Sequence, residues 1–329
     1  MAILKFPRRT FLHLAAGAVA LPAVSRIARA QAYPTRPVRV IVPFPPGGAT
    51  DIFARLAAQK LTEHFGKQFY IENIPGATGN VGTAQAARAA PDGHTLLIAF
   101  SSYVVNPTLF AKLLFDPDKD LAPVTLAVAA TNVITVNPSL PARNLKELVA
   151  LIKSNPGKYS FASGGVGTQP HLLGEMLRQS LALDLVHVPF NGAGPAIASA
   201  VAGHTPIAWS TLASAAQPLE TGQLRALAVT SKTRSQLFSD IPTTAEAGYP
   251  AIQGDSWVGV LVPAGTPNEI IGALRREIVR IIALPDVRER LPTLGFEIVG
   301  STPEEFATRI KVEIETWGKV IRAANIKPE

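Results

Sequence analysis

A regular alternation of short apolar runs with segments of helical spacing constrains the fold of this chain more than any other feature. Runs such as 38–44 and 94–100 are almost continuously apolar, which is typical of strands buried on both faces of a sheet. Segments such as 51–61 and 144–155 place apolar residues three or four positions apart, as amphipathic helices do. This alternation predicts right-handed βαβ units and mostly parallel sheets. Further strands are predicted at 68–73, 132–137, 159–163, 183–190, 205–210, 224–230 and 257–263, and further helices at 82–90, 171–181, 194–203, 267–283 and 303–323.

The domain organisation follows from the length and from the lack of a linker. A chain of 329 residues is long enough for about two ordinary domains. No long stretch rich in Pro, Gly or Ser divides it. Two α/β lobes without such a linker indicate that the chain crosses between them more than once.

Residues 1–30 are typical of an export signal. A basic start precedes an apolar run at 11–24, and small residues at cleavage spacing then end at Ala30 or Ala32. The apolar run is too short for a permanent membrane span, which needs about 20 residues. The arginine pair at 8–9 indicates twin-arginine export, with an ordinary Sec signal as the alternative. We therefore expect cleavage near one of these alanines, a mature protein in the periplasm, and no stable membrane insertion.

Charge and cysteine content exclude several classes of protein. Residues 1–30 hold five of the 31 basic residues and none of the 24 acidic ones, so the rest of the chain has a net charge of only +2. The remaining charges are mixed in sign, which argues against nucleic-acid binding. With no cysteine, the chain has no disulfide, no thiolate metal site and no cysteine nucleophile.

Two predicted strand-to-helix junctions are rich in glycine. They are residues 44–51 (FPPGGATD) and 163–170 (SGGVGTQP), with Thr50 or Asp51 as the expected cap of the first helix. Glycines let backbone amides approach a ligand, and a helix N-terminus adds unpaired N–H groups with a partial positive charge. Ligands of open α/β sheets bind at the carboxyl ends of the strands. Two such loops facing each other therefore predict a clamp for a small anion.

The residues around these loops refine the prediction. Neither loop contains Lys or Arg, and Arg55 is expected to face away, so a carboxylate would be held by amides, hydroxyls and waters. Asp51 is expected both to cap its helix and to form a wall of the pocket. Another strand end adds the hydroxyls of Ser101 and Ser102. Two aromatic residues are expected either to line the pocket or to pack in the core; these are Trp257 and Phe190.

Motifs of common enzymes are missing. Pro170 occupies the last glycine position of a dinucleotide fingerprint, and the P-loop, nucleophile-elbow and zincin motifs do not occur. We expect His94 to be solvated in a turn, His187 to lie in the core, and His171 to be either a pocket donor or a packed cap residue. A Ser163/His171 hydrolase lacks an obvious orienting acid. We therefore predict no enzymatic activity, no metal and no cofactor.

Several segments in this order resemble the Bug family, the periplasmic receptors of tripartite tricarboxylate transporters. They are YPTRPVRVIVPFPPGGATD, NPTLF, SFASGGVGTQPHL, VPFNGAGPAIASAVAG, GQLRALAVTSKTRS, IPTTAEAGYP, VLVPAGTP and GSTPEEFATRI. The resemblance implies a type II periplasmic-binding-protein fold, in which two Rossmann-like α/β lobes close around a ligand cleft like a Venus flytrap. It implies a discontinuous lobe 1 at 31–127 and 252–329, with lobe 2 at 128–251.

The resemblance also implies that the two glycine loops grip a ligand carboxylate, partly through waters. Position by position, it points to Phe44, Gly47, Gly48, Ala49 and Asp51 in lobe 1 and to Ser163, Gly164, Gly165, Thr168 and His171 in lobe 2. The candidate ligand contacts further include Pro45, Ser101, Ser102, Gly167, Phe190, Ala193, Ser199 and Trp257.

Two departures from the family pattern bear on the ligand. Family members commonly carry Tyr-Lys-Gly where this chain has Phe190-Asn191-Gly192, and often an aspartate where it has Ser199. Without that aspartate we expect a carboxylate that has no amino group, such as a di- or tricarboxylate or an aromatic acid. The leading hypothesis is a monomeric solute receptor that delivers this acid to the subunits of a membrane permease. The alternatives are a co-sensor that presents its closed form to a signalling kinase and a periplasmic hydrolase.

Overall fold

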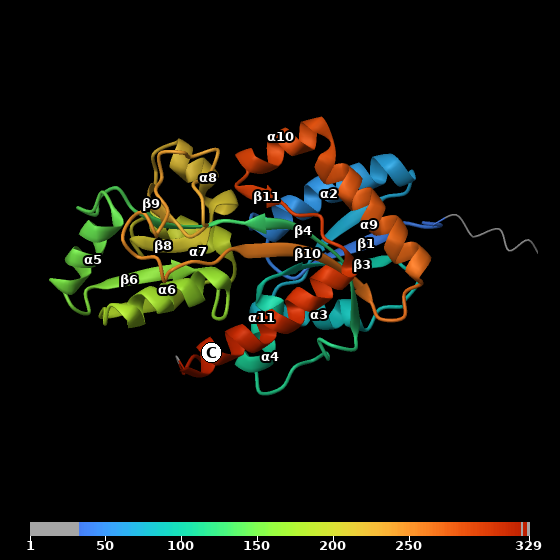
Figure 1. Ribbon diagram of the computed structural model, residues 1–329, viewed down its shortest axis with the longest axis horizontal. Helices are drawn as coiled ribbons and strands as arrows, with labels where there is room; N and C mark the ends of the chain where they lie inside the picture. Colours follow the sequence, from blue (N-terminus) through green and yellow to red (C-terminus); the bar gives the residue numbers. More distant parts are fainter. Residues whose placement is uncertain (1–32, 324, 328–329) are drawn as a thin grey trace, which may run out of the picture.

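The computed structural model describes residues 33–323 and 325–327, which form two α/β lobes side by side (Figure 1). Each lobe is built on one sheet with helices on both faces. The predicted α/β class with two lobes is therefore confirmed. The expected export signal and its cleavage positions lie outside the described residues.

Lobe 1 is built on a six-stranded sheet assembled from two separate parts of the chain. Its strands follow the order β11 (Phe296–Ile298), β4 (Leu121–Ala130), β10 (Ser256–Pro263), β3 (Thr95–Phe100), β1 (Val38–Val42) and β2 (Phe69–Asn73). β1 pairs in parallel with β2 and β3, whereas β10 runs antiparallel to β3 and β4. The prediction of a mostly parallel sheet was therefore wrong here. β4 leads out of lobe 1 and β10 leads back into it, so the two strands run in opposite directions.

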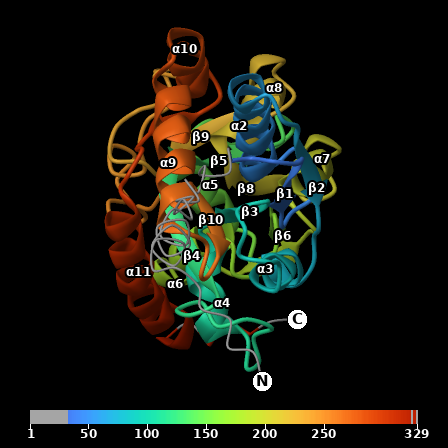
Figure 2. The same cartoon turned by 90° about the vertical axis from the view of Figure 1, so that its right-hand side faces the viewer.

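Strand alternation in lobe 1 produces two apolar layers, one on each face of the sheet. Val40 and Val42 face α2 (Ala49–Phe65), α9 (Asn268–Ala283) and α10 (Pro285–Thr293). Ile41 faces the opposite layer, together with Leu97 and Trp257. That layer is covered by α3 (Asn80–Ala87), α4 (Ser102–Leu109) and α11 (Pro303–Ala323), which Figure 2 shows around lobe 1.

Lobe 2 repeats this arrangement on a five-stranded sheet. The order is β7 (Leu185–Pro189), β6 (Tyr159–Ser163), β8 (Ile207–Thr211), β5 (Asn132–Val136) and β9 (Arg225–Val229), in which β5 runs antiparallel to both of its neighbours. One face packs on α5 (Leu145–Lys153) and α6 (Gln169–Ser180), and the other on α7 (Ala193–Val201) and α8 (Leu212–Glu220). The glycine-rich loop at 164–168 joins β6 to α6.

The chain crosses between the lobes twice, and the crossings are tied together. The first lies between Ala130 and Asn132, because β4 pairs with β10 as far as Ala130 and β5 begins at Asn132. The second precedes β10. Asn132 Nδ2 donates to Gly254 O at 3.0 Å, and Ser256 Oγ donates to Asn132 Oδ1 at 2.8 Å. One buried asparagine of the first crossing segment therefore makes two bonds to the second crossing segment.

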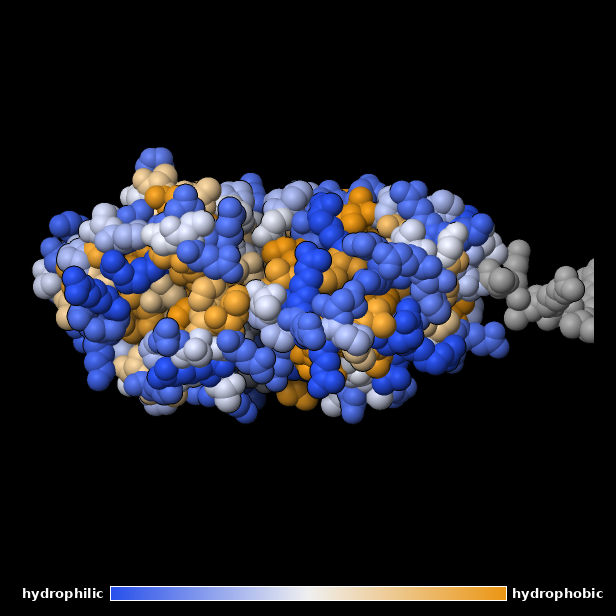
Figure 3. Space-filling model, turned by 90° about the horizontal axis from the view of Figure 1, so that it is seen from above, coloured by the Kyte–Doolittle hydropathy of each residue, from blue (hydrophilic) through white to orange (hydrophobic). Residues whose placement is uncertain are grey.

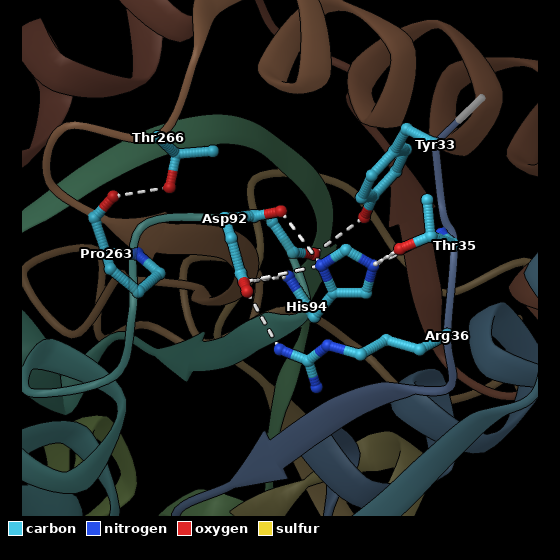
Figure 4. A network of polar contacts seen from close by, with 8 residues as sticks. Tyr33, Thr35, Arg36, Asp92, His94, Pro263 and Thr266 are labelled. Atoms are coloured by element: carbon cyan, nitrogen blue, oxygen red, sulfur yellow. Dashed lines mark hydrogen bonds and ion pairs between the residues drawn. The ribbon is translucent and has the colours of Figure 1, made fainter. Parts of the chain in front are cut away.

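His94 does not lie in solvent as expected. Its side chain is only 8% exposed, because it fastens the segment before β1 to the start of β3 (Figure 4). The ring Nδ1 lies 2.9 Å from Asp92 O, and Nε2 lies 3.3 Å from Thr35 N. Tyr33 Oη donates to Gly93 O at 2.7 Å. This cluster lies at the amino ends of β1 and β3, opposite the strand ends that carry the glycine loops.

The surface is mostly hydrophilic on the face shown in Figure 3, where apolar side chains form only small patches. Within residues 33–323 and 325–327, none of the helices combines the length and the apolar character needed to cross a membrane.

Candidate functional site

Two adjacent cavities lie between the lobes at the carboxyl ends of the strands. The inner cavity is narrow, about 40 Å³, and lies between the 44–50 segment of lobe 1 and the helix starts of lobe 2. The outer cavity, about 360 Å³, extends from it along the 75–79 segment, Phe110 and the 189–192 segment. The two cavities are neighbours, because four residues line both; these are Phe44, Pro45, Gly164 and Gly192.

Four helices begin at the inner cavity. The N-cap residues Gly48 (α2), Thr168 (α6), Gly192 (α7) and Thr211 (α8) all lie on its wall. No side chain of these four caps accepts a hydrogen bond from its own helix. The first-turn N–H groups thus lack a side-chain cap, and each helix end contributes a partial positive charge.

Side-chain charge plays no direct part in this site. Among the residues that the structure describes, no Asp, Glu, Lys, Arg or His lines either cavity. Two of the hydroxyl contacts on the wall are local: Thr168 Oγ1 donates to Gly165 O at 2.8 Å, and one of Thr211 Oγ1 and Ser214 Oγ donates to the other at 2.8 Å. The donors for an anion are then the first-turn N–H groups that have no other partner, together with the hydroxyl hydrogen that the Thr211–Ser214 pair leaves unused.

Asp51 holds the first glycine loop from behind and does not line a cavity. Its carboxylate accepts hydrogen bonds from Gly47 N at 3.1 Å, Arg55 Nε at 2.9 Å and Asn73 Nδ2 at 3.0 Å. Asn73 also donates to Phe44 O at 2.9 Å. Burial raises the pKa of Asp51, but the bonds from Arg55, Asn73 and Gly47 outweigh burial and leave the pKa below its ordinary value. Neither Asp51 nor Thr50 is the cap of α2, because that position belongs to Gly48.

Two stacked histidines support the second glycine loop in a similar way. Gly167 N donates to His171 Nδ1 at 3.0 Å, and the rings of His171 and His187 stack with centroids 3.9 Å apart. Ser163 Oγ lies 2.7 Å from His187 Nε2. Burial lowers the pKa of His171 to about 3 and that of His187 to about 4, so both rings are neutral near pH 7. His171 is thus buried, lies on neither cavity wall, and accepts a hydrogen bond from the loop backbone.

Half of the expected ligand contacts lie on a cavity wall. They are Phe44, Pro45, Gly48, Ala49, Gly164, Gly165, Thr168, Phe190 and Ala193.

Nine expected contacts do not lie on a wall, and most of them have other partners. Ser199 lies in the last turn of α7, and its Oγ donates at 3.0 Å to Thr205 Oγ1, which follows the helix. Trp257 is fully buried in the core, where its Nε1 donates to Glu313 Oε2 at 2.7 Å. The others are Gly47, Asp51, Ser101, Ser102, Ser163, Gly167 and His171.

Two parts of the site are missing from the sequence-based prediction. Ser210 and Thr211 end β8, and Ser214 lies in the first turn of α8, so these small hydroxyl residues lie at and just beyond the end of the strand predicted at 205–210. That position was a usable signal even without glycine. The 75–79 segment of lobe 1 has no strand-to-helix pattern of the expected kind.

Comparison with known proteins identifies the family. The family described as "Tripartite tricarboxylate transporter family receptor" matches residues 53–326. The chain belongs to this receptor family. It is 34% identical to Protein BugT of Bordetella pertussis over 311 residues, which cover 94% of this chain and 95% of BugT. The role of a solute-binding receptor, predicted from the Bug resemblance, is thereby confirmed.

Solved structures of relatives have the same fold. The periplasmic binding protein BugD superimposes with a TM-score of 0.85 at 31% identity, over 90% of this chain and 100% of that one. A Rhodopseudomonas palustris protein, Rpa4515, was solved with adipate and superimposes with a TM-score of 0.87 at 31% identity, over 90% of this chain and 100% of that one. The two-lobed fold of periplasmic binding proteins is therefore confirmed for this receptor.

Proposed function

We propose that this receptor captures a small organic carboxylate between its lobes and delivers it to the membrane permease of a tripartite transporter. The observation that carries the proposal is the convergence of four helix N-termini, none with a side-chain cap, on one cavity. Such a terminus stabilises an anion by about 0.3–2 kcal/mol. Membership of the receptor family and the adipate in the similar Rpa4515 structure support a carboxylate as that anion.

The cavity walls favour an acid without an amino group. An ammonium group is bound most strongly by a carboxylate, and no carboxylate lines either cavity among the described residues. The rings of Phe44, Phe110 and Phe190 offer apolar contact to the body of the acid. We therefore assign di- and tricarboxylates and aromatic acids as the substrate class.

Affinity must come from closure as well as from the helix ends. Micromolar binding requires about 8 kcal/mol, more than a few helix termini supply in open solvent. Because loops of both lobes form the cavity walls, closing the lobes removes water and strengthens every amide contact to the anion. The closed form, with walls from both lobes, is then the form that docks on the permease.

The remaining assignments follow from the same function. Export requires removal of the signal near Ala30 or Ala32, which places the mature receptor in the periplasm. There a monomer can diffuse to the permease.

Ligand capture and delivery need no covalent step. Ser163 contacts His187, and no carboxylate hydrogen-bonds to either within the part of the chain that the structure describes, so the constellation of a hydrolase is incomplete.

A thermal-shift screen tests the proposal. The mature protein, unfolded and refolded to remove carried-over ligand, is mixed with about a hundred organic acids that include adipate, citrate, benzoate and glutamate. A ligand at 100 times its Kd stabilises by about 2.7 kcal/mol, which gives a clear rise in Tm. We expect such a rise for acids without an amino group. A folded protein that responds to amino acids alone, or to none of the acids, would contradict the proposal.

A further inference from the structure

The segment between β2 and α3 has a rare backbone conformation. Gly76, Ala77, Thr78 and Gly79 all have positive φ, at 134°, 47°, 53° and 89°. Ala77 and Thr78 are not glycines, so their left-handed conformation costs free energy that the surrounding structure must supply. Strained segments of this kind are commonly found where they serve binding or switching.

A buried asparagine of α4 holds this segment in place. Asn106 is 2% exposed, and its Nδ2 donates to Thr78 O at 3.1 Å and to Asn80 Oδ1 at 2.9 Å. Asn80 is itself buried at the first position of α3. These bonds fix the carbonyl of Thr78 and leave its side chain directed at the other lobe.

Thr78 contacts the second glycine loop across the cleft. Its Oγ1 donates to Val166 O at 2.7 Å. Within residues 33–323 and 325–327, this is the one hydrogen bond between the lobes that lies away from the two crossing segments. The two lobes also pack closely beside this bond. If residue 167 had a Cβ, that atom would lie only 2.4 Å from Leu109 Cδ2 of α4, so the position has room only for a glycine. The glycine loop thus approaches lobe 1 closely enough for the bond to form.

The bond forms at the outer cavity, where Thr78 and Val166 both lie on the wall. We propose that Thr78 is a positioning residue for ligand capture, whose hydroxyl bonds Val166 O in the closed form and holds the lobes together over the ligand. The inference rests on the proposed function for the link between closure and capture. The strain at Ala77 and Thr78 serves to present this hydroxyl, and Asn106 keeps it presented when the lobes are apart.

Single-molecule fluorescence transfer tests the proposal directly, because closure can be read with or without ligand. The chain contains no cysteine, so dyes attach only at cysteines introduced at the exposed Lys112 of lobe 1 and Gln179 of lobe 2. The unsubstituted receptor is compared with Thr78→Val, which loses the hydroxyl, and Thr78→Ser, which keeps it. Thr83→Val is the matched control, because Thr83 is buried on the neighbouring α3 and makes no hydrogen bond to lobe 2 among the described residues. Each is measured alone and with adipate.

We expect Thr78→Val to shift the equilibrium from closed to open by roughly 2- to 12-fold, the range for loss of one neutral hydrogen bond, and to shorten the closed dwell time. Thr78→Ser should stay close to the equilibrium of the unsubstituted receptor, and Thr83→Val should cause no shift. An unchanged equilibrium in Thr78→Val would overturn the proposal, as would a receptor that never closes under either condition.

The outcome separates this inference from the proposed function. If acids bind in calorimetry while Thr78→Val leaves closure unchanged, the role of Thr78 fails and the carboxylate receptor stands. If no acid binds while Thr78→Val still shifts closure in the free protein, the carboxylate assignment fails and the contact stands.

Discussion

The backbone N–H of Gly167 is bound by the ring Nδ1 of His171, at 3.0 Å, from the helix that the glycine loop leads into. The acceptor nitrogen must be unprotonated for this bond to exist. His171 stacks on His187, which in turn contacts Ser163 at the other end of the loop. The shape of the ligand loop in lobe 2 therefore depends on two neutral imidazoles.

Acid should destabilise the receptor through this pair. Burial, with a smaller effect of His187 and Arg178, lowers the pKa of His171 from 6.5 to about 3. The unfolded chain takes up the proton more readily than the folded one. The stability contribution of the neutral ring is therefore complete above pH 6.5 and is lost as the pH falls from there towards 3. At pH 5 the loss for His171 amounts to about 2 kcal/mol, which urea unfolding at pH 7 and pH 5 measures.

The matched variant for this measurement is His171→Asn, which keeps an acceptor near Gly167 N but does not titrate. Its unfolding free energy should depend less on pH between 7 and 5 than that of the unsubstituted protein. Equal pH dependence in the two proteins would remove His171 from this role.

Gly48→Ala should weaken ligand binding without disturbing the fold. Gly48 has φ −85° and ψ 167°, which alanine adopts readily, and no atom lies within 4 Å of an added Cβ. The methyl group would therefore extend into open space at a position on the wall of the inner cavity. We expect at least a tenfold rise in Kd for the bound acid by calorimetry, and a loss of less than about 1 kcal/mol in unfolding free energy.

Gly47→Ala is the contrasting variant, in which we expect stability to fall. Gly47 has a φ of 91°, where alanine is strained, so the unfolding free energy should drop by about 1 kcal/mol or more. Unchanged affinity in Gly48→Ala would place the ligand elsewhere.

Ser214→Asp should place a side-chain carboxylate in the site where we propose that the ligand carboxylate binds. Ser214 lies in the first turn of α8 and on the wall of the inner cavity. A negative charge there stabilises the helix by about 0.3–1 kcal/mol and repels a bound carboxylate. We expect the Tm of the free protein to rise and binding of organic acids to fall by tenfold or more. Ser214→Asn has a similar shape without the charge, so it should keep most of the affinity. Equal losses in both variants would indicate a steric effect and refute the electrostatic one.

Asp51→Asn should loosen the first glycine loop. The variant loses the charged acceptor for Gly47 N and Arg55, and the expected loss of stability is about 1–3 kcal/mol. Because the pKa of Asp51 is lowered in the folded protein, its contribution is present above pH 3.8 and disappears as the pH falls below that value. Glu63→Gln is the control on the same helix, where an exposed carboxylate contacts Lys60 at 3.7 Å. Urea unfolding at pH 7 should show little change in that control, and a comparable loss in both would contradict the role of Asp51.

Much of the fold could be predicted from apolar periodicity. The strands at 38–44, 94–100 and 159–163 are recognisable because they are buried on both faces and followed by amphipathic helices. Strand direction was harder, because periodicity carries no information on it. β10 is antiparallel to β3 and β4 since it returns the chain to lobe 1 after the second crossing.

The site was only partly predictable for a related reason. Glycine marks the places where backbone can approach a ligand, so the loops at 44–51 and 163–170 stood out. Which polar side chains face the cavity depends on tertiary contacts. Asp51 turns back to Gly47, and Trp257 points to Glu313 on a helix far along the chain. The hydroxyl of Thr78 is directed at lobe 2 because Asn106, from another helix, holds its carbonyl.

The two bonds from Asn132 of the first crossing segment to the second also decide which motion is easy. Two adjacent strands joined by one side chain resist sliding and twisting, since either motion would break a bond to Gly254 or Ser256. Rotation about an axis through the two crossings breaks neither. Small dihedral changes at that axis become a large displacement at the cleft rim, far from it. We therefore expect the lobes to open by rotation about this axis and to regain the same alignment on closing.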